Sequence, residues 1–258
     1  MDVPAERGAL PILPHRAYRR PRLIGRPTIA ASLALTAAME TLVVIFRGDL
    51  ADLFGRAAAA LLPGGHRVPS RPLMGVPIRP LEIDLQPLDY RALLVWFVGS
   101  VIGVALLAKV RRIGTPARYM GIYNLLLIAV TAGYILFAGR IGYGAETFSD
   151  LYLRTAVIIW LVIPVFVGAV SLFLPFTVAE RALILLVTFA YNVAFSAVRY
   201  ALFAWLLSWT GAVAMPALFL FFGPLLDFVY VVGVFSMFLV PLSKRLGREG
   251  PQDVWTWL

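Results

Sequence analysis

Three ionisable side chains stand inside long apolar stretches of this chain, namely Glu40, Arg199 and Asp227. Asn192 precedes Arg199 by seven residues, which places the two side chains on the same face of a helix, two turns apart. Charged groups inside apolar segments are costly, and they are candidates for functional sites. We therefore treat these four residues as one candidate polar cluster.

The sequence also predicts how these charges meet. With a rise of about 1.5 Å per residue, Glu40, Arg199 and Asp227 all fall in the outer half of the membrane. We expect Arg199 to pair with Asp227, with Glu40 as a second partner or a competitor. Three roles remain open for the cluster, which are locking helices together, binding or converting a substrate, and relaying ions. A relay favours carboxylates along a path, and the inner half offers none.

Other residues that could do chemistry are few. The chain has no cysteine and only two histidines, His15 and His66, which lie far apart in polar segments. Disulfides and thiolate chemistry are therefore excluded, and we expect neither a metal site nor a cofactor. Ser149 is a weak nucleophile candidate, because a serine needs a base within hydrogen-bond reach and no histidine is obviously available.

The composition indicates the environment of these residues. Of the 258 residues, 60% are hydrophobic and 14% are charged, and the mean hydropathy is +0.84. A soluble domain this apolar could not cover its own core, so we expect a polytopic membrane protein in contact with the lipid bilayer. The net charge of +9 comes from basic residues between apolar runs, which indicates membrane orientation and not a nucleic-acid partner.

The apolar runs predict an all-α bundle of six transmembrane helices, the first of them a retained helix and not a cleaved signal. Pro164 and Pro224 should kink the fourth and sixth helices or be accommodated by neighbouring helices. The expected spans are 28–46, 92–109, 119–139, 154–176, 182–208 and 217–241.

The basic residues predict the sides of the membrane. The four groups of arginine and lysine fall on one side if the chain has six spans, so both termini should be cytoplasmic. We expect a basic N-terminal tail at 1–27, a membrane domain at 28–241 and a C-terminal tail at 242–258. Residues 47–91 should lie outside as a short interfacial helix followed by a proline-rich extended arm or strand.

Spans four to six show an order of segments that resembles a known family. "TFSDLYLR" opens the fourth span, "NVAFSAVRY" lies in the fifth and "GPLLDFVYVVG" lies in the sixth. This layout resembles the exosortase/archaeosortase family of membrane proteases and transpeptidases. The resemblance implies that Arg199 matches the catalytic arginine, whereas Phe148 and Leu226 stand where the family has its cysteine and histidine. It therefore implies a relative that has kept the fold and lost the acyl-enzyme chemistry.

These observations favour a non-catalytic subunit or accessory scaffold of a membrane complex in a bacterial inner membrane, which binds a membrane-protein partner. Whether any enzymatic activity remains is left open, and the missing nucleophile favours none. One alternative is a peptidase- or transpeptidase-like enzyme with its site on the outer side, using Ser149 or the charged cluster. The second alternative is a small-solute transporter, which would favour a polar path through the inner half and an internal repeat.

Overall fold

The computed structural model describes most of the chain. The described residues are 19–21, 26–62, 71–73, 76–110, 112–139, 144–249 and 255–257. Most of the predicted tail at 1–27, part of the loop within 47–91 and part of the tail at 242–258 lie outside the described residues, as do His15 and His66.

The fold is all-α, and six of its helices are long and apolar enough to cross a membrane. This confirms the predicted class of a multi-pass membrane protein. The six spans are carried by α1 (Arg26–Ile45), α3 (Tyr90–Lys109), α4 (Thr115–Ala138), α5 (Ala145–Leu172), α6 (Val178–Thr210) and α8 (Pro224–Glu249). Shorter elements connect them.

The sixth span differs from the continuous helix that the sequence predicts. A 3-10 turn (Gly211–Ala214) and the short helix α7 (Met215–Leu220) follow α6, and α8 begins only at Pro224. Proline has no backbone N–H and is favoured in the first turn of a helix, so Pro224 starts a new helix where the sequence predicts a kink. At its other end α8 runs on to Glu249, beyond the predicted boundary at 241.

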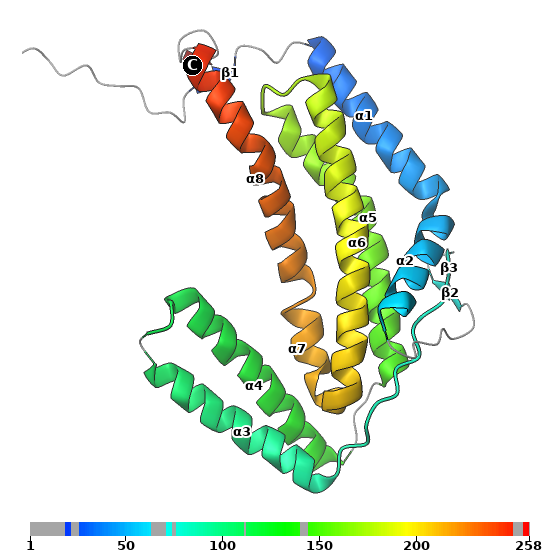
Figure 1. Ribbon diagram of the computed structural model, residues 1–258, viewed down its shortest axis with the longest axis vertical. Coiled ribbons are helices and arrows are strands. Elements are labelled where there is room, and N and C mark those ends of the chain that lie inside the picture. Colours follow the sequence, from blue (N-terminus) through cyan, green and yellow to red (C-terminus); the bar gives the residue numbers. More distant parts are fainter. Residues whose placement is uncertain are drawn as a thin grey trace, which may run out of the picture.

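The helices α1, α5, α6 and α8 form the main bundle (Figure 1). Helix α2 (Arg47–Leu61) follows α1 and packs its buried face against α6. Its Phe54 ring lies 5.5 Å from the Trp160 ring and 5.9 Å from the Tyr200 ring, measured between centroids. The predicted helix in this region is therefore present, and it is anchored by an aromatic core shared with α5 and α6.

A small hairpin follows α2, in which β2 (Arg71–Leu73) pairs antiparallel with β3 (Val76–Ile78). An extended arm, residues 79–89, runs from this hairpin to the start of α3 (Figure 1). The arm is held to the bundle at Leu81, which is buried and donates its backbone N–H to the Tyr200 hydroxyl at 3.2 Å. The predicted arm is thus a fixed part of the fold.

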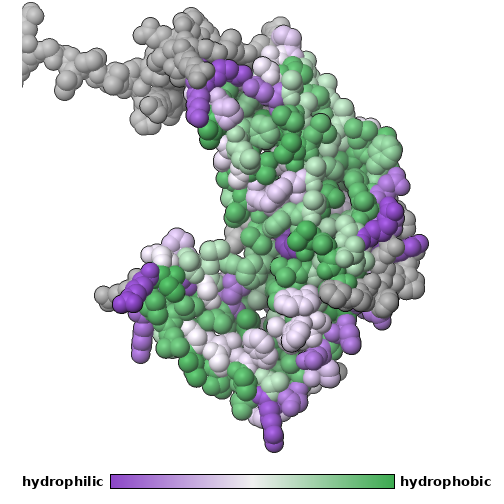
Figure 2. Space-filling model, in the orientation of Figure 1, coloured by the Kyte–Doolittle hydropathy of each residue, from purple (hydrophilic) through white to green (hydrophobic). Residues whose placement is uncertain are grey.

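Helices α3 and α4 form a hairpin that leans away from the bundle (Figure 1). They pack closely on each other, and α4 contacts the bundle through α7 and the 3-10 turn before it. Figure 2 shows a wide notch on this face of the molecule, between the hairpin and the part of the bundle where α8 lies. Two membrane-length helices therefore stand largely apart from the main bundle.

The two ends of the described chain meet at one end of the bundle. β1 (Arg19–Pro21) pairs antiparallel with β4 (Trp255–Trp257), close to where α1 begins and α8 ends (Figure 1). An even number of spans requires both termini on one side, as the sequence predicts. That this side is cytoplasmic remains a prediction from the basic residues.

Candidate functional site

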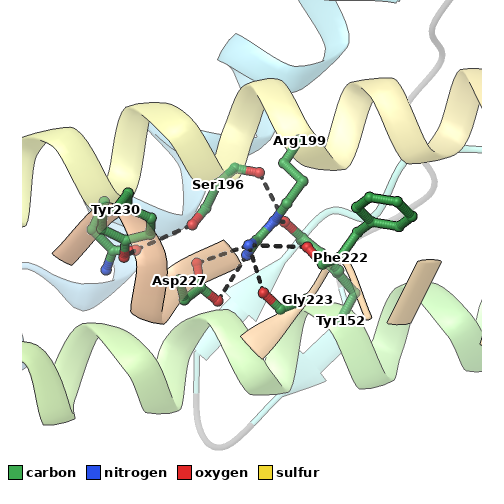
Figure 3. A network of polar contacts seen from close by, with 8 residues as sticks. Tyr152, Ser196, Arg199, Phe222, Gly223, Asp227 and Tyr230 are labelled. Carbon is green, nitrogen blue, oxygen red and sulfur yellow. Dashed lines mark hydrogen bonds and ion pairs between the residues drawn. The ribbon is translucent and has the colours of Figure 1, made fainter. Parts of the chain in front are cut away.

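Arg199 is buried where α5, α6 and α8 meet, and its guanidinium group forms an ion pair with Asp227 (Figure 3). Nη1 lies 2.8 Å from Oδ1, and Nη2 donates to Oδ2 at 2.9 Å. Both side chains are buried, with exposed fractions of 4% for Arg199 and 6% for Asp227. The predicted pairing is confirmed, and the pairing avoids much of the cost of burying either charge alone.

The same arginine also holds the interruption between α7 and α8. Nη1 donates to the backbone carbonyl of Gly223 at 2.9 Å and to that of Phe222 at 3.3 Å (Figure 3). These carbonyls belong to the residues between the two helices, and a backbone acceptor inside a membrane needs an internal partner. Arg199 therefore stabilises the broken span through its backbone as well as through Asp227.

Glycine is required at the interruption. A Cβ atom added to Gly223 would lie 2.3 Å from the backbone oxygen of Phe219. That separation is far below van der Waals contact, so any side chain would force the backbone to shift. The sequence places Gly223 beside Pro224, and this pair is the local signal that could have revealed the break.

Tyr152 completes the contacts of Arg199, and no pattern in the sequence predicts this contact. Arg199 Nε donates to the tyrosine hydroxyl at 2.9 Å, and this hydroxyl donates to the Ser196 carbonyl at 3.0 Å. The arginine carbon Cζ also lies 5.5 Å from the Tyr152 ring centroid. Every nitrogen of the guanidinium group therefore has a protein partner, and the contacts join α5, α6 and α8.

Asn192 extends the network along α6 to a position two turns before Arg199, as the spacing of the two residues predicts. Its Oδ1 accepts hydrogen bonds from the Ser196 hydroxyl at 3.2 Å and from the Tyr230 hydroxyl on α8. Its Nδ2 is buried without a hydrogen-bond partner among the described residues, and so is the Thr188 hydroxyl one turn further on. The network thus follows the α6–α8 contact toward the centre of the bundle.

Glu40 is not brought into this network. No hydrogen bond or ion pair joins it to Arg199 within the described part of the chain, and its Oε2 is buried without a partner. Helix α1 packs mainly against α5, with fewer contacts to α6. Tyr152 of α5 takes the place that the sequence assigned to Glu40.

Ser149 lies apart from the Arg199 network, at the beginning of α5. It is buried, and it lines a cavity together with the neighbouring Asp150 and with Glu82 from the arm. Its hydroxyl group is a hydrogen-bonding neighbour of the Tyr200 side chain, and no histidine or carboxylate is bonded to it among the described residues, so no base activates it in this arrangement. The structure therefore gives no support for Ser149 as a nucleophile. Its position in the lining of a cavity is not predicted by the sequence.

A second buried arginine contradicts a simple interpretation of the sequence. Arg181 lies between the expected fourth and fifth spans, which predicts a basic loop residue, yet it lies in the first turn of α6 with an exposed fraction of 1%. It donates to the Ser32 hydroxyl and to the carbonyls of Leu174 and Phe176. Arg181 therefore holds the α5–α6 connection to α1 through hydrogen bonds and has no carboxylate partner among the described residues.

No group of three or more histidine, cysteine, aspartate or glutamate side chains in the described part of the chain could hold a metal ion. The hydrogen-bond donors of Arg199 are already bonded to the protein. The network is therefore better suited to holding helices together than to binding an anionic ligand. No family model, no curated protein and no solved structure matches this chain.

Proposed function

We propose that this protein is a non-catalytic subunit or scaffold of a membrane complex, and that it holds a transmembrane segment of another protein. The proposal places it in a bacterial inner membrane with both termini in the cytoplasm. It also keeps the exosortase-like relationship, with the Arg199–Asp227 pair standing where that family has catalytic groups.

The observation that carries the proposal is the α3–α4 hairpin. In α3 only Leu93 and Ser100 are buried, and in α4 only Ala129, Ala132 and Gly133. Transmembrane helices associate by close packing and by hydrogen bonds between helices, and the hairpin has little of either with the main bundle. A notch opens beside it in Figure 2, with the hairpin on one side and the main bundle on the other.

The alternatives have less support. The enzyme alternative lacks an activated nucleophile, because Ser149 has no hydrogen-bonded base and Phe148 is buried where the resembled family has its cysteine. The transporter alternative lacks a free charge at the cluster, because the nitrogens of Arg199 are all engaged by the protein.

The test is affinity purification of the full chain from native membranes in a mild detergent, followed by native mass spectrometry. We expect a partner in a fixed ratio. Replacement of two strongly exposed hairpin residues by tryptophan, Val95→Trp with Val130→Trp, should reduce partner recovery while the protein remains folded. A monomer without any protein partner from native membranes would contradict the proposal.

A further inference from the structure

Glu40 is an intramembrane carboxylate that the Arg199 network does not use. It lies in α1, five residues before the helix ends at Ile45, which is about 8 Å along the helix axis. Its Oε2 atom is buried, and no hydrogen bond or ion pair reaches it from the described part of the chain. A carboxylate inside a membrane needs a cation or hydrogen-bond donors, and here the surrounding helices supply neither.

Helix α1 lies at the edge of the bundle (Figure 1). Over residues 27–45 only Ser32 and Val43 are buried. The buried side of the helix packs mainly against α5, where Gly168 leaves room for the Thr36 side chain. The other side of α1 is therefore left to lipid or to another protein.

The exposed side of α1 carries a row of small residues. Four exposed residues follow one another at intervals of three or four positions, namely Ala30, Ala34, Ala37 and Thr41. This spacing places them on one face of the helix, which we call the small-residue face. Small residues let the backbone of a second transmembrane helix approach closely. Glu40 is partly buried and lies at the border of this face, three residues after Ala37.

The unpaired carboxylate and the small-residue face point to the same kind of occupant. A lipid chain can cover the small residues, but it brings no charge to the depth of Glu40. A transmembrane helix with a lysine or arginine at that depth satisfies both features, because close packing brings its cation within reach of the carboxylate. The cation is itself costly inside a membrane, so pairing lowers the cost for both helices.

We propose that the small-residue face of α1 binds a transmembrane helix of another protein, which carries a lysine or arginine at the depth of Glu40. The inference rests on the proposed function, because it takes the partner to be a membrane protein. It adds a contact surface separate from the α3–α4 hairpin and states the chemistry that the partner must offer. Arg154 of α5 is exposed, which makes a second copy of this chain the competing occupant.

The test measures binding of model transmembrane peptides to the full chain in phosphatidylcholine nanodiscs. The peptides are leucine–alanine helices of about 20 residues with lysine, glutamine or aspartate at the depth of Glu40. The chain has no cysteine, so Gly48→Cys, at a position where a Cβ meets no atom within 4 Å, can carry a fluorescent donor. Energy transfer to an acceptor on the peptide reports binding. We expect the lysine peptide to bind about tenfold more tightly than the glutamine peptide.

Variants of Glu40 test the charge. Glu40→Gln keeps nearly the same shape and should remove the preference for lysine, and Glu40→Lys should prefer the aspartate peptide instead. Asp49→Asn is the matched control, because Asp49 is an exposed carboxylate just after α1, and it should keep the preference for lysine. Equal binding of the lysine and glutamine peptides by the parent would overturn the proposal. So would an unchanged preference in Glu40→Gln.

A second pair of variants tests the face. Ala37→Trp should weaken the binding of the lysine peptide at least several-fold, because the ring prevents close approach of the helices. Leu42→Trp is the control, since Leu42 is 50% exposed but lies outside the row of small residues. An equal loss in both variants would contradict docking on the small-residue face.

Purification from native membranes separates this inference from the proposed function. Loss of the native partner in Glu40→Gln, as in the hairpin tryptophan variant, would support both. Full recovery of the partner in Glu40→Gln, while the hairpin variant loses it, would overturn this inference alone. A monomer from native membranes would overturn the proposed function. A dimer of the parent in nanodiscs that Glu40→Gln abolishes would assign the face to a second copy and overturn the occupant proposed here.

Discussion

The Arg199 network and the α3–α4 hairpin show two ways of holding membrane helices. At the network, α5, α6 and α8 are joined by a buried ion pair and by hydrogen bonds whose geometry is specific. At the hairpin, two helices pack on each other through apolar and small residues, and most of their surface is unburied. The first region is internally complete, whereas the second leaves surface for lipid or for another protein.

This difference means that the helix arrangement is strictly determined at the Arg199 network, whereas the hairpin can accept different neighbours. A buried charge fixes one arrangement of its neighbours, because any other arrangement leaves it without partners. Apolar helix faces in a lipid environment have no such preference, since lipid tails and side chains offer similar contacts. Substitutions should therefore have large effects at the network and small ones at the hairpin.

The largest effect is expected when one partner of the buried pair is removed. Asp227→Leu should destabilise the protein by about 3–5 kcal/mol, because Arg199 would be left as an uncompensated buried charge. The double variant Asp227→Leu with Arg199→Leu should regain part of this loss. Unfolding by titration with a denaturing detergent measures both. A double variant less stable than the single one would show that the backbone carbonyls, and not the ion pair, dominate the role of Arg199.

The next effect concerns the interruption of the sixth span. Gly223→Ala should destabilise the protein by about 1–3 kcal/mol, because the added carbon atom meets the Phe219 carbonyl. Gly233→Ala is the control within the following helix α8, since a Cβ there meets no atom within 4 Å. This control should be neutral or stabilising, as alanine favours helix over glycine. Equal melting temperatures for both variants would contradict the predicted clash.

The sequence predicted the fold more fully than the site, for physical reasons. Apolar runs of membrane length and basic residues between them depend only on local composition, so the six spans followed from them. The Arg199–Asp227 pair followed from estimated depth, because two opposite charges at one depth have few other partners. Tyr152 could not be found in this way, because a tyrosine at a helix position is common and its contact depends on helix rotation.

The interruption between α7 and α8 and the buried Arg181 are two further features that could not be fully predicted from the sequence. Gly223 and Pro224 indicated a distortion, but only the packing of α7 against its neighbours makes it a complete break. The position of Arg181 between two apolar runs predicts a loop residue, because charge usually marks the membrane surface. Its hydrogen bonds to loop carbonyls compensate for burial, and such backbone acceptors cannot be located from residue types alone.

An effect of similar size is expected from a single hydroxyl in the network, and none from a hydroxyl in the hairpin. Tyr152→Phe removes the acceptor for Arg199 and the donor for the Ser196 carbonyl, which should cost about 1–3 kcal/mol because buried groups lose their partner. Tyr134→Phe on α4 changes the same group at a position that is 60% exposed. The control should leave the melting temperature unchanged. A comparable loss in both variants would mean that the network is no more specific than the hairpin.

The last prediction makes one chemical change, the addition of a single methylene group, in the bundle core and in the hairpin. Val167 on α5 is 1% exposed and Val130 on α4 is 69% exposed. Val167→Leu adds a methylene group to a packed core and should cost about 1–3 kcal/mol through strain. Val130→Leu adds the same group to a surface facing lipid, where the change should stay within about 0.5 kcal/mol.

If Val130→Leu also destabilised the purified protein, the hairpin face would be packed against another protein chain in solution. Native mass spectrometry of the parent would show whether that chain is a second copy or a partner. Equal tolerance at both positions would instead show that the bundle core is as adaptable as the hairpin, against the division of roles inferred from the buried network.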